Sequence, residues 1–147
     1  DAIIFAIVEN IFNEQISFLE QLLSGEGRAE ERLITLIEII AGSIEQTIVA
    51  MPSPIDIYAE TMRKPELQSE LKQYSERYQA LLVNLIEQGN REGDFAVDNP
   101  ELTAFIFIAS IEGLILLHSI AQAEQNLTDM IKQSTQIFLQ GIKIKGD

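Results

Sequence analysis

Residues 102–120 constrain this sequence most, because they are apolar on every side and carry a single acid, Glu112, near their middle. A helix that is hydrophobic all round either crosses a membrane or lies at the centre of a helical assembly. The stretch is long enough for a bilayer, but a charge at the centre of a span costs at least about 2.5–3.5 kcal/mol. Ser110, His118 and Ser119 dilute the run, and no aromatic belt or basic flank brackets it. The sequence therefore favours a helix buried within a protein, with no membrane partner.

The composition indicates one globular domain over residues 1–147, with 46% hydrophobic and 22% charged residues. The chain has no cysteine, which excludes disulfides and thiolate chemistry and agrees with the cytoplasmic location that we expect. Its formal net charge of −13 repels phosphate backbones and anionic lipids. The chain by itself is therefore not expected to bind nucleic acid.

Apolar residues recur at three- and four-residue intervals along the chain, and no stretch alternates with the period of a strand. The pattern predicts an all-α fold of about six helices. Ser53 and Asn99 stand before prolines as expected N-caps, and Gly93 is expected to end a helix in the left-handed conformation. The predicted helices cover residues 2–23, about 30–51, 54 to about 62, about 67–91, 100 to about 121–124, and, after a cap at Asn126 or Thr128, a segment through residue 142.

A projection of residues 102–120 at 100° per residue separates a bulky stripe around Glu112 from a stripe of small and branched residues. The last helix also carries small residues beside apolar ones. Two such helices per chain predict an isologous four-helix interface between two copies of the chain, and hence a homodimer. The candidate interface residues are Thr103, Ile106, Ser110, Gly113, Leu114, Leu117, Ala121, Ile131, Ser134, Thr135, Phe138, Gly141 and Ile142.

Three segments in a fixed order carry a family resemblance. They are Leu85-Ile86-Glu87-Gln88-Gly89-Asn90-Arg91-Glu92-Gly93-Asp94-Phe95, then Asp98-Asn99-Pro100-Glu101-Leu102, then Ile111-Glu112-Gly113-Leu114. The first segment reads as a helix that ends in a Gly-x-x-x-Gly-acidic-Phe turn, the second as an Asp-Pro-Glu-like helix start, and the third as an acidic-Gly-Leu step. In this order they resemble the regulatory domain of TetR-family transcriptional repressors of the broad AcrR-like type. Supporting matches are Asp1-Ala2-Ile3-Ile4-Phe5, Glu31-Arg32-Leu33 and Phe138-Leu139-Gln140-Gly141.

The resemblance implies the helical bundle of a TetR C-terminal domain, with its last two helices in the dimer interface. It also implies that a basic helix-turn-helix domain precedes this chain in a longer protein and alone contacts operator DNA; the missing initiator Met and the excess of acid agree with this expectation. A small, largely apolar effector would bind among the helices and weaken operator binding. Such an effector must prefer one arrangement of the two DNA-binding domains over the other.

Cavities for such effectors are lined by apolar and aromatic side chains with a few placed polar groups. For each Phe, Met or Leu the alternative is ordinary core packing. For Glu112 the alternative is a structural hydrogen bond between helices, because an unpaired buried carboxylate is costly. The candidate ligand-binding residues are Phe18, Thr47, Met51, Tyr58, Met62, Tyr74, Tyr78, Phe105, Ala109, Glu112 and Leu116.

No motif in the sequence supports catalysis, a metal or a cofactor. The single histidine, His118, lies six residues from Glu112 and off its face, so the Glu-x-x-His step of di-iron bundles is absent. There is also no Gly-rich phosphate loop and no nucleophile motif. We therefore expect a binding domain rather than an enzyme, with no catalytic residue, metal or cofactor. The alternative is a helical oligomerisation domain without a ligand; a cavity of roughly 300 Å³ beside Glu112 would favour the ligand-binding function.

Overall fold

The computed structural model describes residues 2–50, 53–122 and 124–145, and these residues contain six α-helices and no strand. The all-α prediction is confirmed, and each helix lies within a few residues of its predicted position. The helices are α1 (Ala2–Ser24), α2 (Ala29–Ala50), α3 (Pro54–Arg63), α4 (Pro65–Glu92), α5 (Pro100–Ala121) and α6 (Leu127–Ile142).

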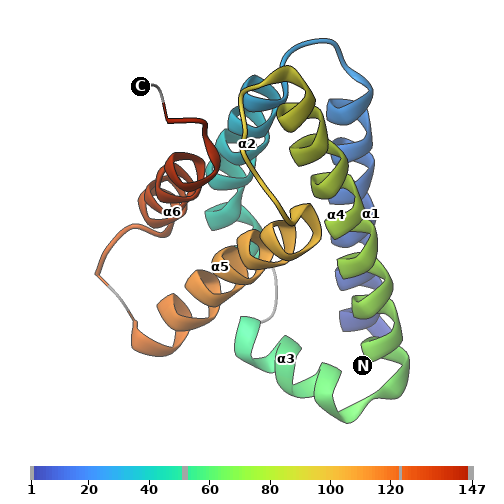
Figure 1. Ribbon diagram of the computed structural model, residues 1–147. Coiled ribbons are helices and arrows are strands. Elements are labelled where there is room, and N and C mark those ends of the chain that lie inside the picture. The colour runs from blue at the N-terminus through green and yellow to red at the C-terminus, as the bar shows by residue number, and fades with distance from the viewer. Residues whose placement is uncertain (1, 51–52, 123, 146–147) are drawn as a thin grey trace.

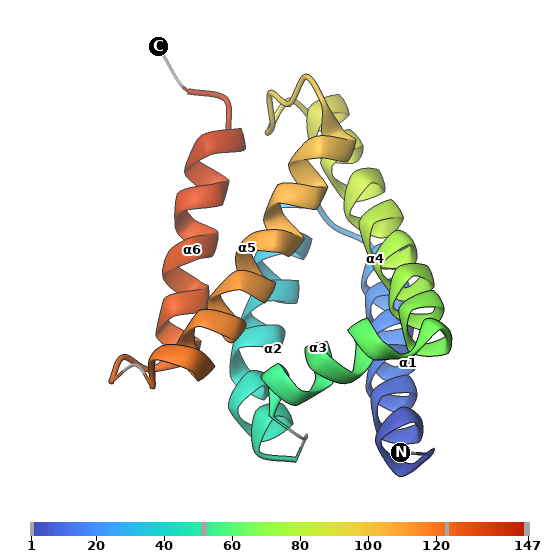
Figure 2. The same cartoon turned by 90° about the horizontal axis from the view of Figure 1, so that it is seen from below.

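Helix α4 is the centre of the arrangement, because it packs against α1, α2, α3 and α5. It runs beside α1 in the same direction (Figure 1). Helix α6 packs against α2 and α5 on the other side of the molecule. The short helix α3 crosses from the end of α2 to the start of α4 (Figure 2). Together α2, α3, α4 and α5 surround the region where their apolar faces meet.

The helix ends follow the predicted capping residues with one exception. The side chain of Asn99 accepts a hydrogen bond from the backbone N–H of Leu102 at 3.0 Å, and that of Asn126 accepts one from Asp129 at 3.2 Å. Ser53 precedes α3, but its side chain makes no capping hydrogen bond. The fixed φ of Pro54 at the first helical position is already suited to a helix, so α3 begins there without a side-chain cap.

The turn after α4 is closed around Gly89. Its carbonyl oxygen accepts hydrogen bonds from the backbone N–H groups of Asp94 at 3.0 Å and Phe95 at 3.1 Å, while Gly93 has the predicted left-handed φ of 79°. The buried ring of Phe95 occupies the place of a Cβ at Gly89: an added Cβ would lie 2.0 Å from the nearest ring carbon. The Gly-x-x-x-Gly-acidic-Phe pattern is thus explained by packing at its first glycine and by backbone conformation at its second.

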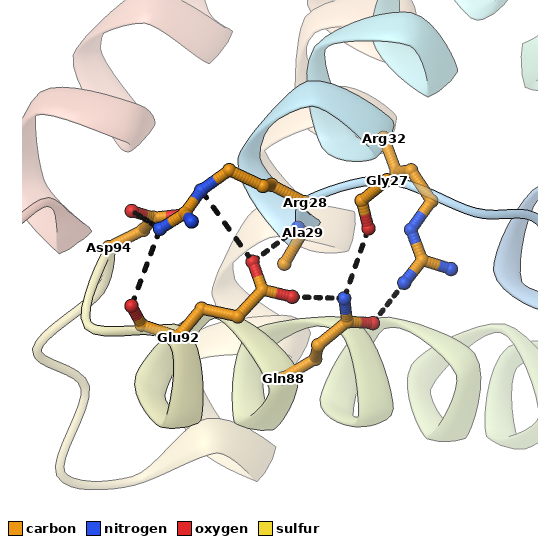
Figure 3. A network of polar contacts seen from close by, with 7 residues as sticks. All are labelled: Gly27, Arg28, Ala29, Arg32, Gln88, Glu92 and Asp94. Atoms are coloured by element: carbon orange, nitrogen blue, oxygen red, sulfur yellow. Dashed lines mark hydrogen bonds and ion pairs between the residues drawn. The ribbon is translucent and has the colours of Figure 1, made fainter.

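A polar network joins the α1–α2 loop to the end of α4 (Figure 3). Arg28 donates to both carboxylate oxygens of Asp94, at 2.9 Å from Nε and 2.5 Å from Nη2. The carboxylate of Glu92 accepts the first backbone N–H of α2 at 3.1 Å, and Gln88 links Glu92 to the buried Arg32. These bonds fix the start of α2 against the end of α4.

This network is expected to make stability depend on pH. The hydrogen bond and charge of Arg28 lower the pKa of Asp94, so the folded carboxyl has a lower pKa than the unfolded one, which is about 3.9. Its stabilising contribution is therefore complete above about pH 4 and is lost as the pH falls through the folded pKa. We expect Asp94→Asn to be less stable than the wild type in urea at pH 6, and this difference to shrink below pH 4.

The exposed Asp98→Asn variant is the matched control for that titration. It is expected to follow the wild-type stability curve at every pH. A stability difference between Asp94→Asn and the wild type that stays constant from pH 6 to pH 2 would show that the Arg28–Asp94 ion pair does not produce the pH dependence.

Helix α5, which contains residues 102–120, is buried by the rest of the chain far less than the sequence predicted. By length and composition alone it could cross a membrane, yet only 11% of its most apolar window is buried within the chain. Ala104 and Phe107 are its buried residues. The other helices of the chain therefore cover one face only. The uncovered face, which we call the outer α5 face, exposes more than half of the surface of each of its large apolar residues, Leu102, Phe105, Ile106, Leu117 and Ile120.

Candidate functional site

A cavity of about 300 Å³ lies among α1, α2, α3, α4 and α5. Four of these helices contribute residues at three- or four-residue spacing, as expected for the inner faces of helices that converge on one space. The cavity is thus a product of packing between segments that are distant in sequence. Its lining residues are Gln15, Ile40, Ile44, Thr47, Ile48, Pro54, Ile57, Tyr58, Leu71, Tyr74, Ser75, Tyr78, Phe107, Ile108, Ile111, Glu112 and Ile115.

Two hydrogen bonds across the cavity wall connect different helices. The hydroxyl group of Tyr58, on α3, donates to Oε2 of Glu112, on α5, at 2.6 Å. The hydroxyl group of Tyr74, on α4, donates to Oε1 of Gln15, on α1, at 2.5 Å. The ring of Tyr78 lies beside that of Tyr74, with 5.9 Å between the ring centroids. Glu112 thus makes the helix–helix hydrogen bond and also faces the cavity, so the two alternatives for this residue are not exclusive.

The electrostatics of the cavity are dominated by one negative charge. Glu112 is the only charged residue among the lining residues of the described chain. Burial raises the pKa of Tyr58, Tyr74 and Tyr78, and the charge of Glu112 raises each of them further. The three phenol groups therefore stay protonated across the physiological pH range. The cavity presents neutral aromatic rings, branched aliphatic side chains and one carboxylate.

The structure brings some of the predicted ligand-binding residues together and separates others from them. Thr47, Tyr58, Tyr74, Tyr78 and Glu112 line the cavity. Met51 lies outside the described residues. The remaining candidates do not line the cavity; they are Phe18, Met62, Phe105, Ala109 and Leu116.

Two of these displaced candidates have a clear physical explanation. Met62 is 75% exposed because it lies on the outward side of α3. Phe105 is 55% exposed and belongs to the outer α5 face, whereas Phe107 is the aromatic residue of α5 that lies inside. The projection of residues 102–120 therefore assigned Phe105 to the wrong face of α5. A helix that is apolar all round gives no signal for which side faces inward.

Most of the missed cavity residues are isoleucines of α2 and α5 together with Gln15 and Ser75. The isoleucines have the helical spacing of core residues, and nothing in their pattern distinguishes a cavity wall from a filled core. Gln15 had a weak signal, because it is a polar residue next to the buried Ile16 on α1.

The candidate dimer residues also divide into two groups. Ile131, Thr135 and Ile142 are buried within the chain itself, so they have no surface left for a partner. Phe138 packs against Phe107, with ring centroids 4.7 Å apart. The assignment of Ile131, Thr135 and Ile142 to a dimer interface is therefore corrected, because this side of α6 packs on α2 and α5, whereas Phe138 is only partly buried and stays a candidate. The other candidates that remain at the surface or at its edge are Thr103, Ile106, Ser110, Gly113, Leu114, Leu117, Ala121, Ser134 and Gly141.

No group of three or more His, Cys, Asp or Glu side chains in the described part of the chain is placed to hold a metal ion. The lining residues offer a ligand apolar surface, aromatic rings, neutral hydrogen-bonding groups and the carboxylate of Glu112.

Sequence comparison assigns most of the chain to a family. Residues 29–137 match the family described as BetI-type transcriptional repressor, C-terminal. The chain belongs to the TetR family of transcriptional regulators. The match is to its C-terminal regulatory domain, a non-enzymatic domain that typically binds a ligand. Membership also implies an intracellular location. A comparison with curated proteins found no match.

Solved structures of the TetR family share the fold. A TetR/AcrR-family regulator from Thermobifida fusca YX-ER1 superposes with a TM-score of 0.66 at 20% identity, over 95% of this chain and 73% of that one. A TetR-family regulator from Cytophaga hutchinsonii gives a TM-score of 0.64 at 18% identity, over 99% and 70%. The regulator FadR from Bacillus subtilis, solved in complex with stearoyl-CoA, gives a TM-score of 0.67 at 16% identity, over 91% and 72%.

Proposed function

We propose that this chain is the ligand-sensing and dimerisation domain of a TetR-like transcriptional repressor. In the full-length protein a small, largely apolar effector would bind in the cavity beside Glu112 and weaken operator binding by a separate DNA-binding domain. The observation that carries the proposal is the cavity of about 300 Å³, which reaches the lower end of the range for small-molecule sites. A helical domain with no ligand would be expected to fill this space with side chains.

The position of the cavity supports a role in sensing. Its wall includes Gln15 of α1, which is hydrogen-bonded to Tyr74 of α4, and residues of α3 and α5 that are joined by the bond between Tyr58 and Glu112. A ligand that displaces or strengthens these bonds would change how α1 and α3 sit on the rest of the domain. A ligand can shift a conformational equilibrium only by the difference in its affinity for the two states. The structure of FadR with stearoyl-CoA is consistent with effector binding in this fold.

The outer α5 face supports the dimerisation part of the proposal. Its five large apolar side chains are each more than half exposed, and contiguous apolar surface of this kind marks interaction sites on soluble proteins. Gly113 lies on the same helix, and a Cβ added there would meet nothing within 4 Å. This leaves room for close approach by a helix of a second copy. We therefore place a homodimer on this face, with α6 at its edge.

The cavity can be tested with Nile red, a neutral apolar dye whose fluorescence rises and shifts to the blue when it leaves water. We expect the purified protein to bind one dye per chain. Ile108 lines the cavity, so Ile108→Trp, which fills the space, is expected to weaken dye binding at least tenfold. Thermal unfolding followed by circular dichroism would establish that the variant remains folded.

The control variant for this test is Val49→Trp, because Val49 is 88% exposed on α2 and is not among the cavity residues. It is expected to bind Nile red as the wild type does. If Ile108→Trp and Val49→Trp bind the dye equally well, the dye lies elsewhere and the cavity is not the site. The alternative, an oligomerisation domain without a small-molecule ligand, would then be preferred.

A further inference from the structure

We infer that the effector of this domain is an organic cation with an apolar body, bound with its positive group beside Glu112. This inference rests on the proposed function, because it assumes that the cavity is the effector site. It goes further by assigning a charge to the ligand.

The charges of the cavity favour a cation over an anion. Glu112 is the only charged lining residue of the described chain, so no Lys, Arg or His side chain is placed to neutralise an anionic ligand. The one helix N-terminus at the cavity is that of α3, whose first residue there is Pro54, and Asp56 lies in the same turn. Proline offers no N–H, and an acid in the first turn offsets the positive end of the helix dipole.

The neutral hydrogen-bonding groups do not offset the preference set by the charge of Glu112. The hydroxyl hydrogen of Tyr58 is donated to Glu112, and that of Tyr74 is donated to Gln15. The hydrogens of these two hydroxyl groups are therefore already used within the wall. The other neutral polar side chains of the lining carry both donors and acceptors and favour neither sign of charge; they are Gln15, Thr47, Ser75 and Tyr78. Burial and the negative charge of Glu112 keep the phenols protonated, so their rings remain neutral. The carboxylate of Glu112 beside neutral aromatic rings suits an ammonium or another cationic group, which also interacts favourably with ring faces.

The exposure of Glu112 sets where the charge of the ligand would lie. Glu112 is at the open edge of the cavity, since its side chain remains exposed, while Tyr78 and Phe107 lie deep in the wall. A cation beside Glu112 keeps part of its hydration, so the desolvation penalty that makes buried ion pairs costly is reduced. The apolar body of the same ligand can fill the isoleucine-lined interior. The geometry thus separates a charged rim from an apolar interior.

The test uses three probes of the same shape that differ in charge: benzyltrimethylammonium, the neutral neopentylbenzene and the anionic phenylmethanesulfonate. Each is titrated against the protein with bound Nile red, and its affinity is obtained from displacement of the dye. The key variant is Glu112→Gln, which removes the charge and keeps an oxygen that can accept the hydrogen bond from Tyr58. We expect this variant to lower the affinity for the ammonium probe at least tenfold and to change the affinity for neopentylbenzene by less than twofold.

The control is Glu87→Gln on α4, an exposed acid that does not line the cavity and changes the net charge equally. It is expected to leave all three affinities unchanged. The inference is overturned if Glu112→Gln affects the ammonium and neutral probes alike, or if the sulfonate displaces the dye as well as the ammonium does. If either result is found while Nile red and neopentylbenzene still bind to the wild-type protein, the inference fails but the proposed function stands. If no probe and no dye binds, the proposed function fails together with the inference.

Discussion

Replacing Gly89 by alanine is expected to destabilise the domain by about 1–3 kcal/mol, the usual cost of overpacking a core. An alanine Cβ at this position would lie 2.0, 2.4 and 2.7 Å from three ring carbons of Phe95. The ring cannot move away cheaply, because it is 2% exposed and its backbone N–H is bonded to the Gly89 carbonyl oxygen. Urea unfolding would measure the loss as a lower transition midpoint.

The matched control for this substitution is Gly42→Ala in the middle of α2. A Cβ at Gly42 would meet nothing within 4 Å, so only the helix propensity of the residue changes. Alanine is favoured over glycine in a helix interior by roughly 0.5–1 kcal/mol, and this variant is expected to be slightly more stable than the wild type. Equal effects of the two substitutions would mean that contact with Phe95 does not explain the glycine at position 89.

The double variant Ile106→Glu with Leu117→Glu is expected to convert the protein from a dimer into a monomer. Both side chains are more than half exposed on the outer α5 face. An isologous interface would bury each substitution twice, placing four carboxylates without partners in an apolar contact. We expect the dimer dissociation constant to rise at least a hundredfold. Sedimentation velocity at micromolar concentration would give the molar mass of the main species.

Val49→Glu is the control for the dimer experiment, since Val49 is an apolar residue on α2 that is even more exposed, at 88%, and does not belong to the outer α5 face. It is expected to sediment as the wild type does. A wild-type protein that is monomeric at micromolar concentration would refute the dimer proposal outright. A double variant that remains dimeric would place the contact on another face.

Much of the fold could be predicted from local sequence signals. Asn99 caps the helix it was expected to cap, Asn126 is the one of the two expected residues that caps α6, and Gly93 adopts the expected left-handed conformation. These features depend on a few neighbouring residues, so the sequence alone contains the necessary information. The same holds for the turn after α4, although the reason for its first glycine emerged only from the position of the Phe95 ring.

The site could be predicted only where polar or aromatic residues stand out from an apolar pattern. Tyr58, Tyr74, Tyr78 and Glu112 were expected at a ligand site for this reason, and they line the cavity. The isoleucines that form most of the remaining wall have the periodicity of any buried helix face. Whether the space between such faces is filled or empty depends on how the helices are spaced, and no single helix contains that information.

The sequence by itself determined that residues 102–120 form a helix with an uninterrupted apolar surface and one acid. Only the tertiary structure decided which side of α5 faces inward: Phe107 lies inside and Phe105 outside, and Glu112 lies at the boundary between them, bonded to Tyr58 of α3. The physical reason is that a helix finds its inner side by burying apolar residues and exposing polar ones. A helix that is apolar all round gives no such preference, so its orientation is set by the shapes of the helices packed against it.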